Sequence, residues 1–304
     1  MAISRAQLVK ELEPGLNALF GLEYKRYDNQ HAEIYTNESS DRAFEEEVML
    51  SGFANANVKV EGSGVNYDQS QETYTARYTH DTIALAFAIT EEAIEDNLYD
   101  KISSRYTKAL ARSMSNAKQV KAAAPLNNGL PTADNFDSGD GVSLFNTSHT
   151  TVSGTSVKNT LTTQADLNET SLEQALIDIA AFTDERGLRV AAKGVKMIIP
   201  SANQFSAERL LKSQGRTGTA DNDINAVASM GMVPQGYRVN NFLTDSDSWY
   251  IITDVPNGMK MFTRAPLTTA MEGDFDTGNV RYKARERYAF GASDFRGIFG
   301  CEGA

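Results

Sequence analysis

The stretch from Thr90 to Ala124 constrains the fold of this chain most, because its pattern predicts one very long helix. Its larger apolar residues recur at steps of four and three, which places them in one stripe along a helix. We expect Thr90 to cap this helix and Pro125 to end it. At about 1.5 Å per residue the helix would span roughly 50 Å, so its stripe requires a long flat partner, such as a sheet or another subunit. An ordinary long helix in an α+β enzyme is the alternative.

The net charge and the cysteine content limit the class of protein. The 304 residues include 40 acidic and 29 basic side chains, a net charge of −11, so we expect no large basic surface that grips nucleic acid. A protein that only encloses nucleic acid tolerates this charge. The single cysteine, Cys301, allows no intramolecular disulfide. Because no apolar run approaches the ~18 residues of a membrane span, we expect no membrane partner.

The first 80 residues are too poor in core-forming side chains to fold alone. Residues 1–50 contain a short amphipathic segment that we expect Pro14 and Gly15 to interrupt, and then a helical turn or two at Asp41 to Leu50. Residues 54–80 predict a hairpin with a polar tip. Its few bulky aliphatic residues indicate an arm that reaches away from the core. An ordinary N-terminal extension and an ordinary surface hairpin are the alternatives.

Strands and helices alternate through much of the remaining chain. Residues 82–89 alternate large apolar residues with alanines, which predicts a strand that is buried on both sides. From about residue 170 to residue 264 the alternation predicts an α/β subdomain. We expect its first helix to run from Leu172 to Arg186, with a capping box formed by Thr170 and Glu173.

The last long strand carries four cations on one face. Apolar residues share one parity from Val280 to Phe290, and the cations share the other parity; they are Arg281, Lys283, Arg285 and Arg287. We expect at least two of them to pair with acidic residues, within the subunit or across an interface. The candidate acids are Glu91, Glu92, Glu95 and Asp96 at the helix start and Glu45, Glu46 and Glu47 near the N-terminus. A solvated face is the alternative, and a nucleic-acid contact is less favoured because no aromatic residues interleave the cations.

A search for catalytic or ligand-binding motifs finds none. The three histidines, His31, His80 and His149, have no metal-ligand spacing with one another. The sequence contains no nucleophile elbow, no P-loop and no complete dinucleotide fingerprint. Cys301 has no evident base nearby in the sequence, so a spare thiol is the better interpretation. We therefore expect a structural protein with no cofactor, no metal and no catalytic residues.

The order of these parts resembles the major capsid protein of tailed double-stranded DNA bacteriophages. The most specific stretches are Thr73 to Asp100, which enters the long helix, and Trp249 to Gly300, which ends in ARERYAFGASDFRGIFG. The phrase SLFNTSHT, from Ser143 to Thr150, also looks like a loop of this family. The resemblance covers essentially the whole chain, although each stretch is a loose pattern.

The resemblance implies an α+β fold with four regions. They are an N-terminal arm at 1–50, an extended loop at 51–82 that overlaps an adjacent subunit, a peripheral domain at 83–125 and 256–304 with its spine helix at 90–124, and an axial domain at 126–255. The axial domains of neighbouring subunits would cluster around the centres of hexamers and pentamers.

The resemblance also implies a function and a set of partners. The chain would self-assemble as hexamers and pentamers into an icosahedral phage head, built in the cytoplasm of a bacterial host, that encloses double-stranded DNA without sequence-specific binding. No long scaffolding segment precedes the N-terminal arm, so a separate scaffolding protein is implied, with a portal protein and, in some members, a decoration protein. Two alternatives remain open: an encapsulin-like nanocompartment shell that holds cargo enzymes, and a soluble α/β enzyme with an unrecognised site.

The residues that we expect at subunit interfaces come from the extended loop, the helix start and the cationic strand face. They are Lys59, Tyr67, Tyr74, Arg77, Glu91, Glu92, Glu95, Arg281, Lys283, Arg285 and Arg287. Some family members cross-link a loop lysine to an asparagine of a neighbour. Lys59 is the only lysine in this loop, and no cross-link follows from its presence alone.

Overall fold

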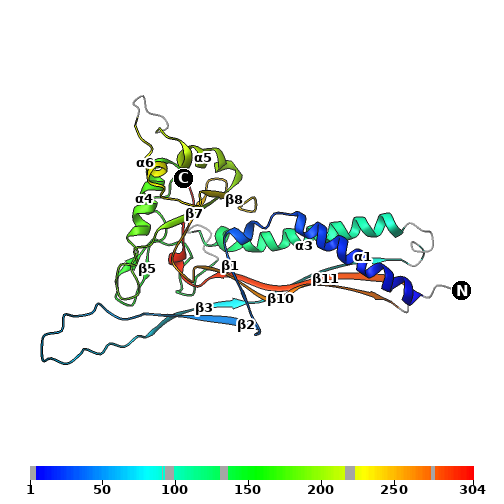
Figure 1. Ribbon diagram of the computed structural model, residues 1–304, viewed down its shortest axis with the longest axis horizontal. Helices are drawn as coiled ribbons and strands as arrows, with labels where there is room; N and C mark the ends of the chain where they lie inside the picture. The colour runs from blue at the N-terminus through cyan, green and yellow to red at the C-terminus, as the bar shows by residue number, and fades with distance from the viewer. Residues whose placement is uncertain (1–4, 91, 93–98, 131–135, 216–222, 275–277) are drawn as a thin grey trace.

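The long helix lies along a sheet, as Figure 1 shows, and this sheet has four strands. The computed structural model describes residues 5–90, 92, 99–130, 136–215, 223–274 and 278–304. The described chain has three parts. An elongated region holds two long helices and the four-stranded sheet, a compact region holds a second sheet, and a projecting loop at residues 51–71 extends away from both.

The long helix is α3, which runs from Tyr99 to Asn128. The expected cap at Thr90 and the first turns cannot be compared, because residues 91 and 93–98 lie outside the described residues. Leu110 and Met114 of the predicted stripe are buried against α1 (Arg5–Arg26) and the sheet. The stripe is thus confirmed at the middle of the helix, and its flat partner is a sheet of the same chain.

Two details of α3 differ from the prediction. Tyr106 and Val120 of the stripe are half exposed, while polar Gln119 is buried because it hydrogen-bonds the backbone of His31. Pro125 does not end the helix, which continues for three more residues. Proline costs little so close to the end, where tyrosine hydroxyl groups satisfy helix carbonyls: Tyr35 donates to Ala122 O at 2.6 Å, and Tyr250 donates to Leu126 O at 3.2 Å.

The sheet of the elongated region has the strand order β1-β10-β11-β4. Its strands are β1 (Thr36–Ser39), β10 (Met259–Gly273), β11 (Val280–Ala292) and β4 (Asp81–Ile89). The predicted alternation of β11 is confirmed, because Val280, Tyr282, Ala284, Glu286 and Tyr288 are buried on the helix side. The opposite face of this sheet, which we call the open face, carries the four cations.

Strand β4 is not buried on both sides as its sequence predicts. It is the end strand of the sheet, and its alanines Ala84, Ala86 and Ala88 are exposed on the open face. Alanine at alternate positions fits a tightly covered strand, but it fits equally well a bare face that a neighbouring molecule covers. The sequence pattern could not distinguish these two cases.

The N-terminal 50 residues also differ from the prediction. Helix α1 continues through Pro14 and Gly15, because Leu16 and Phe20 pack on α3 and the sheet and offset the local cost. A short 3-10 helix, η1 (Gln30–Glu33), follows. The segment expected to be helical forms strand β2 (Phe44–Leu50). Its apolar residues Phe44 and Val48 are spaced by four, a step that suits one face of a helix and one face of a strand alike.

The expected hairpin is present and its second strand lies where predicted, but its first strand lies elsewhere. Strand β2 pairs with β3 (Glu72–Thr79) in an antiparallel pair, so the hairpin begins before residue 54. Among the described residues, no strand forms between 51 and 71, which we had expected to supply the first strand around Val58. This segment is the projecting loop, the long thin excursion in Figure 1.

The compact region is built on the sheet β12-β9-β7-β8. Its strands are β7 (Gly194–Ile199), β8 (Tyr237–Val239), β9 (Trp249–Thr253) and β12 (Ile298–Cys301), and its helices are α4 (Glu169–Ala180), α5 (Gln204–Lys212) and α6 (Ala226–Met230). The short elements are β5 (His149–Thr150), β6 (Ser156–Val157), η2 (Ser201–Asn203) and η3 (Phe295–Gly297). The predicted alternation of helices and strands is therefore present up to Thr253. The strand expected at 259–264 instead belongs to β10 of the elongated region, and the last strand of the chain, β12, joins this sheet.

Helix α4 begins and ends earlier than predicted. Asn168 caps it, and Ser171 closes a capping box with Asn168, so the expected pair Thr170 and Glu173 does not form the box. The helix ends at Ala180, because the chain then turns to place Glu185 in the interior. No described helix is both long enough and apolar enough to cross a membrane.

Candidate assembly surfaces

The projecting loop presents apolar side chains to solvent. Val58 is 95% exposed and Tyr67 is 97% exposed. Lys59, between Val58 and Val60, is also exposed and has no ion pair among the described residues. Exposed apolar side chains grouped in one segment are typical of a surface that another molecule covers. Of the expected interface residues, Tyr67 and Lys59 are thus free to contact a neighbour.

Other expected interface residues are turned toward their own chain. In strand β3, the Arg77 guanidinium lies 4.1 Å from the centre of the Phe44 ring, and its Nε lies 3.7 Å from Glu46 Oε1. These contacts join β3 to β2, so Arg77 stabilises the hairpin that carries the projecting loop. Both partners are largely exposed, so the ion pair contributes little, about 0–1 kcal/mol.

Tyr74 lies at the junction of the hairpin and the compact region, beside a buried ionic cluster. Arg296 is the centre of this cluster: it donates to Glu185 Oε1 at 2.7 Å, to Asp294 Oδ1 at 3.2 Å and to Thr183 O at 2.7 Å. Burial raises the pKa of the Tyr74 hydroxyl, and the charge of Asp294 raises it further. The cluster joins η3 to the segment that follows α4 within the compact region, and Tyr74 of β3 packs against the main core beside it.

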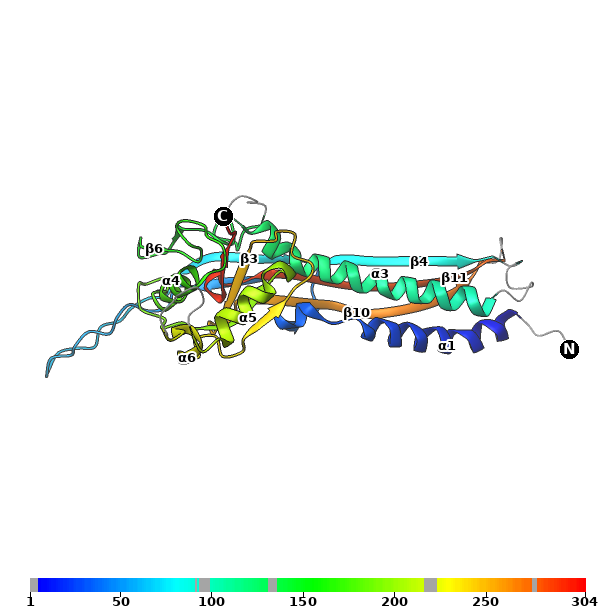
Figure 2. The ribbon, with the colours of Figure 1, turned by 90° about the horizontal axis from the view of Figure 1, so that it is seen from above.

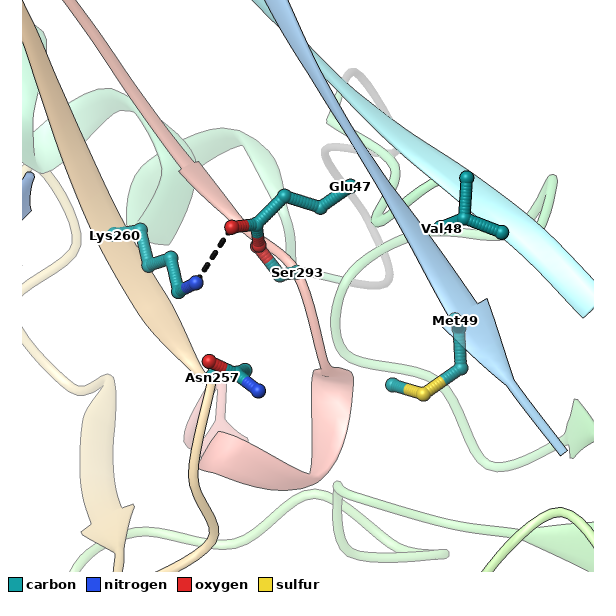
Figure 3. A pocket seen from close by; sticks show the side chains of 6 residues that line it. All are labelled: Glu47, Val48, Met49, Asn257, Lys260 and Ser293. Atoms are coloured by element: carbon teal, nitrogen blue, oxygen red, sulfur yellow. Dashed lines mark hydrogen bonds and ion pairs between the residues drawn. The ribbon is translucent and has the colours of Figure 1, made fainter. Parts of the chain in front are cut away.

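A second buried charge lies where strand β2 meets β10, beside a cavity of about 280 Å³ (Figure 3). Lys260 donates to Glu47 Oε1 at 2.6 Å and lies 3.1 Å from Glu38 Oε1. Burial alone lowers the pKa of Lys260, but the two carboxylates outweigh it and hold that pKa above its ordinary value. Lys260 of β10 therefore connects the hairpin, through Glu47, to the sheet of the elongated region, and it also holds Glu38 of the neighbouring strand β1.

The cations of the open face have few acidic partners within the chain. Arg281 pairs with Asp274, whereas Lys283, Arg285 and Arg287 have no ion pair among the described residues. Of the expected acids, Glu46 and Glu47 pair with Arg77 and Lys260 instead, and Glu45 accepts a hydrogen bond from Ser40. Glu91, Glu95 and Asp96 lie outside the described residues, and Glu92 is exposed. Among the described residues, none of the four cations pairs with an expected acid, and only Arg281 has an ion pair, with Asp274; pairing across an interface stays a prediction.

One constellation has the residue types of a catalytic acid–base set. The Asp140 carboxylate lies 2.5 Å from His149 Nδ1, and His149 Nε2 lies 3.0 Å from Asn159 Oδ1. The His149 ring is fully buried and stacks on Phe295, with ring centres 3.8 Å apart. The Asn159 amide also donates to Phe295 O at 3.0 Å. With both ring nitrogens bonded and no opening to solvent, this group holds the loop around residue 149 against the end of the chain.

A model of the phage capsid protein family matches residues 73–300, which is well over half of the chain. The chain belongs to the phage capsid protein family. This capsid protein is therefore structural and shell-forming, not an enzyme. Among the described residues, no group of three or more histidine, cysteine or acidic side chains is placed to hold a metal ion.

Solved structures share the fold at low sequence identity. A virus-like particle from Pyrococcus furiosus is 11% identical with a TM-score of 0.53, over 95% of this chain and 98% of that chain. The capsid of an empty GTA particle is 15% identical with a TM-score of 0.54, over 91% of each chain. The procapsid of bacteriophage JBD30 is 14% identical with a TM-score of 0.54, over 99% of this chain and 77% of that chain. No curated protein matches the sequence.

Sequence reasoning missed the two buried cations, although a signal for each was present. Lys260 interrupts the apolar run Met259 to Phe262, and Arg296 stands between Phe295 and Ile298 in another. A lone charge inside an apolar segment indicates a buried ion pair. What the sequence could not supply is the partner, because Glu47 and Glu185 are more than 100 residues away in each case.

Proposed function

We propose that this capsid protein is the major subunit of a tailed-phage head. Copies of it assemble as hexamers and pentamers into an icosahedral shell that encloses double-stranded DNA without reading its sequence. The net charge of −11 supports enclosure rather than tight DNA binding, because a strongly acidic subunit repels phosphate. The shell itself would be the location of the protein in the virion.

The projecting loop is the observation that carries this proposal. Its residues reach beyond both regions of the subunit (Figure 1). Its apolar side chains, Val58 and Tyr67 among them, are left uncovered by the part of the chain that the structure describes. A neighbouring subunit would cover them in a shell. Subunits that interlock in this way are held by many repeated contacts, which together are far stronger than any one of them.

We propose the same four regions that the family resemblance implies, with two changes supported by strand pairing. Residues 1–50 would be the N-terminal arm, 51–82 the extended loop, 83–125 and 256–304 the peripheral domain, and 126–255 the axial domain. Strand β12 pairs with β9, so residues 298–301 are better assigned to the axial domain. Strand β2 pairs with β3, so residues 44–50 are better assigned to the extended loop.

Excision of the projecting loop tests the proposal. The Ser51 amide donates to Gln71 O at 2.9 Å, so these residues lie side by side and residues 52–70 can be replaced by an Asn-Gly turn. This cut leaves β3 intact, whereas a deletion from Gly64 to Tyr74 would remove its start. We expect the shortened subunit to unfold at the wild-type temperature and to form no closed shells under the electron microscope.

A variant with a loop of full length separates the effect of the length of the loop from the effect of its apolar side chains. Val58→Ser with Tyr67→Ser keeps the loop and removes apolar contacts, so we expect shells that form slowly or fall apart on dilution. Hydrogen exchange on the unassembled wild-type chain should show residues 55–67 unprotected and the same residues protected in particles. Closed shells of normal size from the shortened chain would contradict the proposal.

The contents and companions of the particle test the remaining parts. We expect particles from infected cells to contain DNA, whereas a protein cargo would favour the nanocompartment alternative. The family resemblance supports assembly in the bacterial cytoplasm with a scaffolding protein, a portal protein and a decoration protein. Mass spectrometry of immature and mature particles checks each of these partners separately.

A further inference from the structure

The free edge of strand β4 is the least protected part of the elongated region. Strand β4 pairs with β11 on one side in an unbroken register from Asp81–Tyr288 to Ile89–Val280, and no described strand pairs with its other side. Alternate residues therefore turn their backbone N–H and C=O groups outward. Figure 2 shows β4 as the outermost ribbon along this side of the elongated region.

The opposite edge of the same sheet is protected by the usual devices. Strand β1 covers the beginning of β10, the register shifts beyond Thr263, and Pro266 removes one amide donor. Helix α1 then packs along β10, where Asn17 accepts a hydrogen bond from Thr269. Strand β4 has neither proline nor bulge, and its sequence DTIALAFAI is mostly apolar. Such an edge is a template for another strand.

The two faces beside this edge differ in a way that specifies the incoming strand. On the helix side, Leu85 is 45% exposed and Tyr106 of α3 is 50% exposed, so an apolar strip borders the edge. On the open face, Ala84, Ala86 and Ala88 lie opposite Arg285, Lys283 and Arg281 of β11. Because alanine is short, the long cationic side chains can extend over it toward the next strand position. An amphipathic strand with one apolar face and one acidic face fits this site.

The projecting loop contains a segment with this pattern. In residues 64–70, Val65 and Tyr67 share one parity and Asn66 and Asp68 share the other, and no strand forms there. The segment around Val58 has the same apolar spacing, but its opposite parity carries Lys59 as well as Glu61, so it offers no net negative charge and the cations of the open face would repel Lys59. Charge thus selects residues 64–70 over the other side of the loop.

We propose that residues 64–70 of a second copy of this chain add as a fifth strand to the free edge of β4. Val65 and Tyr67 of the second copy cover Leu85 and Tyr106, and Asp68 faces the cations. This inference rests on the proposed shell function and goes beyond it, because it assigns the mode of contact and the residues on both sides. Main-chain hydrogen bonds would supply affinity, and the alternate side chains would supply register.

Cysteine cross-linking tests the contact in assembled particles. The native Cys301 is fully buried, so engineered thiols report alone. Directly opposed residues on paired strands have Cβ atoms about 4.5–5.5 Å apart, close enough for a disulfide after a small shift. We expect Asn66→Cys, combined with Ala84→Cys, Ala86→Cys or Ala88→Cys, to yield covalent oligomers upon oxidation in at least one combination. Val65→Cys with the same three partners is the matched control, because its side chain points to the other face.

The outcomes separate this inference from the proposed function. If wild-type particles form and no Asn66 combination exceeds its Val65 control several-fold, the strand addition is wrong while the shell function stands. If wild-type chain forms no particles, the proposed function itself fails. Protection of the open-face cations only in DNA-filled particles, without cross-links, would assign that face to DNA and also overturn the inference.

A pair of proline variants tests the strand addition if the cysteine variants do not assemble into particles. Consecutive residues of β4 direct their amides alternately to β11 and to the free edge, so one of Leu85→Pro and Ala86→Pro removes only an outward donor. We expect the variant that keeps a folded subunit by circular dichroism to lose shell assembly. Normal shells from that folded variant would overturn the proposal.

Discussion

Replacement of Glu185 by glutamine should destabilise this capsid protein more than any comparable surface change. Glu185 is 5% exposed, and its partner Arg296 is 3% exposed, so water cannot take over the role of either. The substitution keeps the size and an acceptor oxygen but removes the negative charge. The arginine stays charged at any accessible pH, so it would remain buried with Asp294 as its single ionic partner.

The size of the effect follows from what remains around Arg296. Breaking a buried ion pair on one side costs about 3–5 kcal/mol when the other charge is left alone. Here Asp294 and Thr183 O stay in place, and the glutamine oxygen still accepts a hydrogen bond, so we expect about 2–3 kcal/mol. For a large domain that corresponds to roughly 4–12 °C in the midpoint of thermal unfolding.

Calorimetry of the unassembled subunit measures this shift directly. Glu61→Gln in the projecting loop is the control, because the same chemical change at an exposed position should leave the midpoint within about 1 °C. A Glu185→Gln chain that melts with the control would refute the view that this buried ion pair contributes to the stability of the subunit. We also expect residues 72–79 to exchange amide hydrogens faster in the variant, since Tyr74 lies beside the cluster.

Three further predictions concern other parts of the subunit. Gly139→Ala should cost about 1–3 kcal/mol in unfolding, because this residue has φ +99° and an added Cβ would meet the β3 backbone at 2.5 Å. Burial raises the pKa of Asp140, but hydrogen bonds from His149 and Ser138 outweigh it and leave the pKa below its ordinary value. The contribution of Asp140 is thus present above the unfolded pKa and lost as pH falls through the folded one, so Asp140→Asn should flatten the acid limb of stability measured between pH 6 and 2. Arg285→Gln with Arg287→Gln should slow formation of empty shells in light scattering; normal empty shells that fill poorly with DNA would instead favour a DNA-facing role.

The spacing of apolar residues predicted correctly those helices and strands that pack on one side only. The stripe of α3 and the alternation of β11 could be predicted because each element buries one side, which faces the other element, and exposes the opposite side. The same reasoning failed for β2, where Phe44 and Val48 are spaced by four and suit either structure. It also failed for β4, because small residues at alternate positions suit an uncovered face as well as a buried one.

The candidate surfaces were only partly within reach of the sequence. The cations of β11 could be placed on one face from parity alone, and the structure keeps them there. Their partners could not be predicted, because pairing between distant segments depends on the topology. Glu47 is more than 200 residues from Lys260, and no local pattern connects them. The ionic cluster around Arg296 is hidden for the same reason.

Because the base of the projecting loop is closed, the stability of the subunit depends little on the length of this loop. Ser51 and Gln71 are joined by a backbone hydrogen bond, so insertions between them lengthen a loop whose ends are already fixed. Doubling such a loop costs only about 0.6 kcal/mol in closure entropy. Insertions here would therefore change the reach of the loop between subunits while the rest of the fold stays unchanged, so assembly would be altered without a loss of subunit stability.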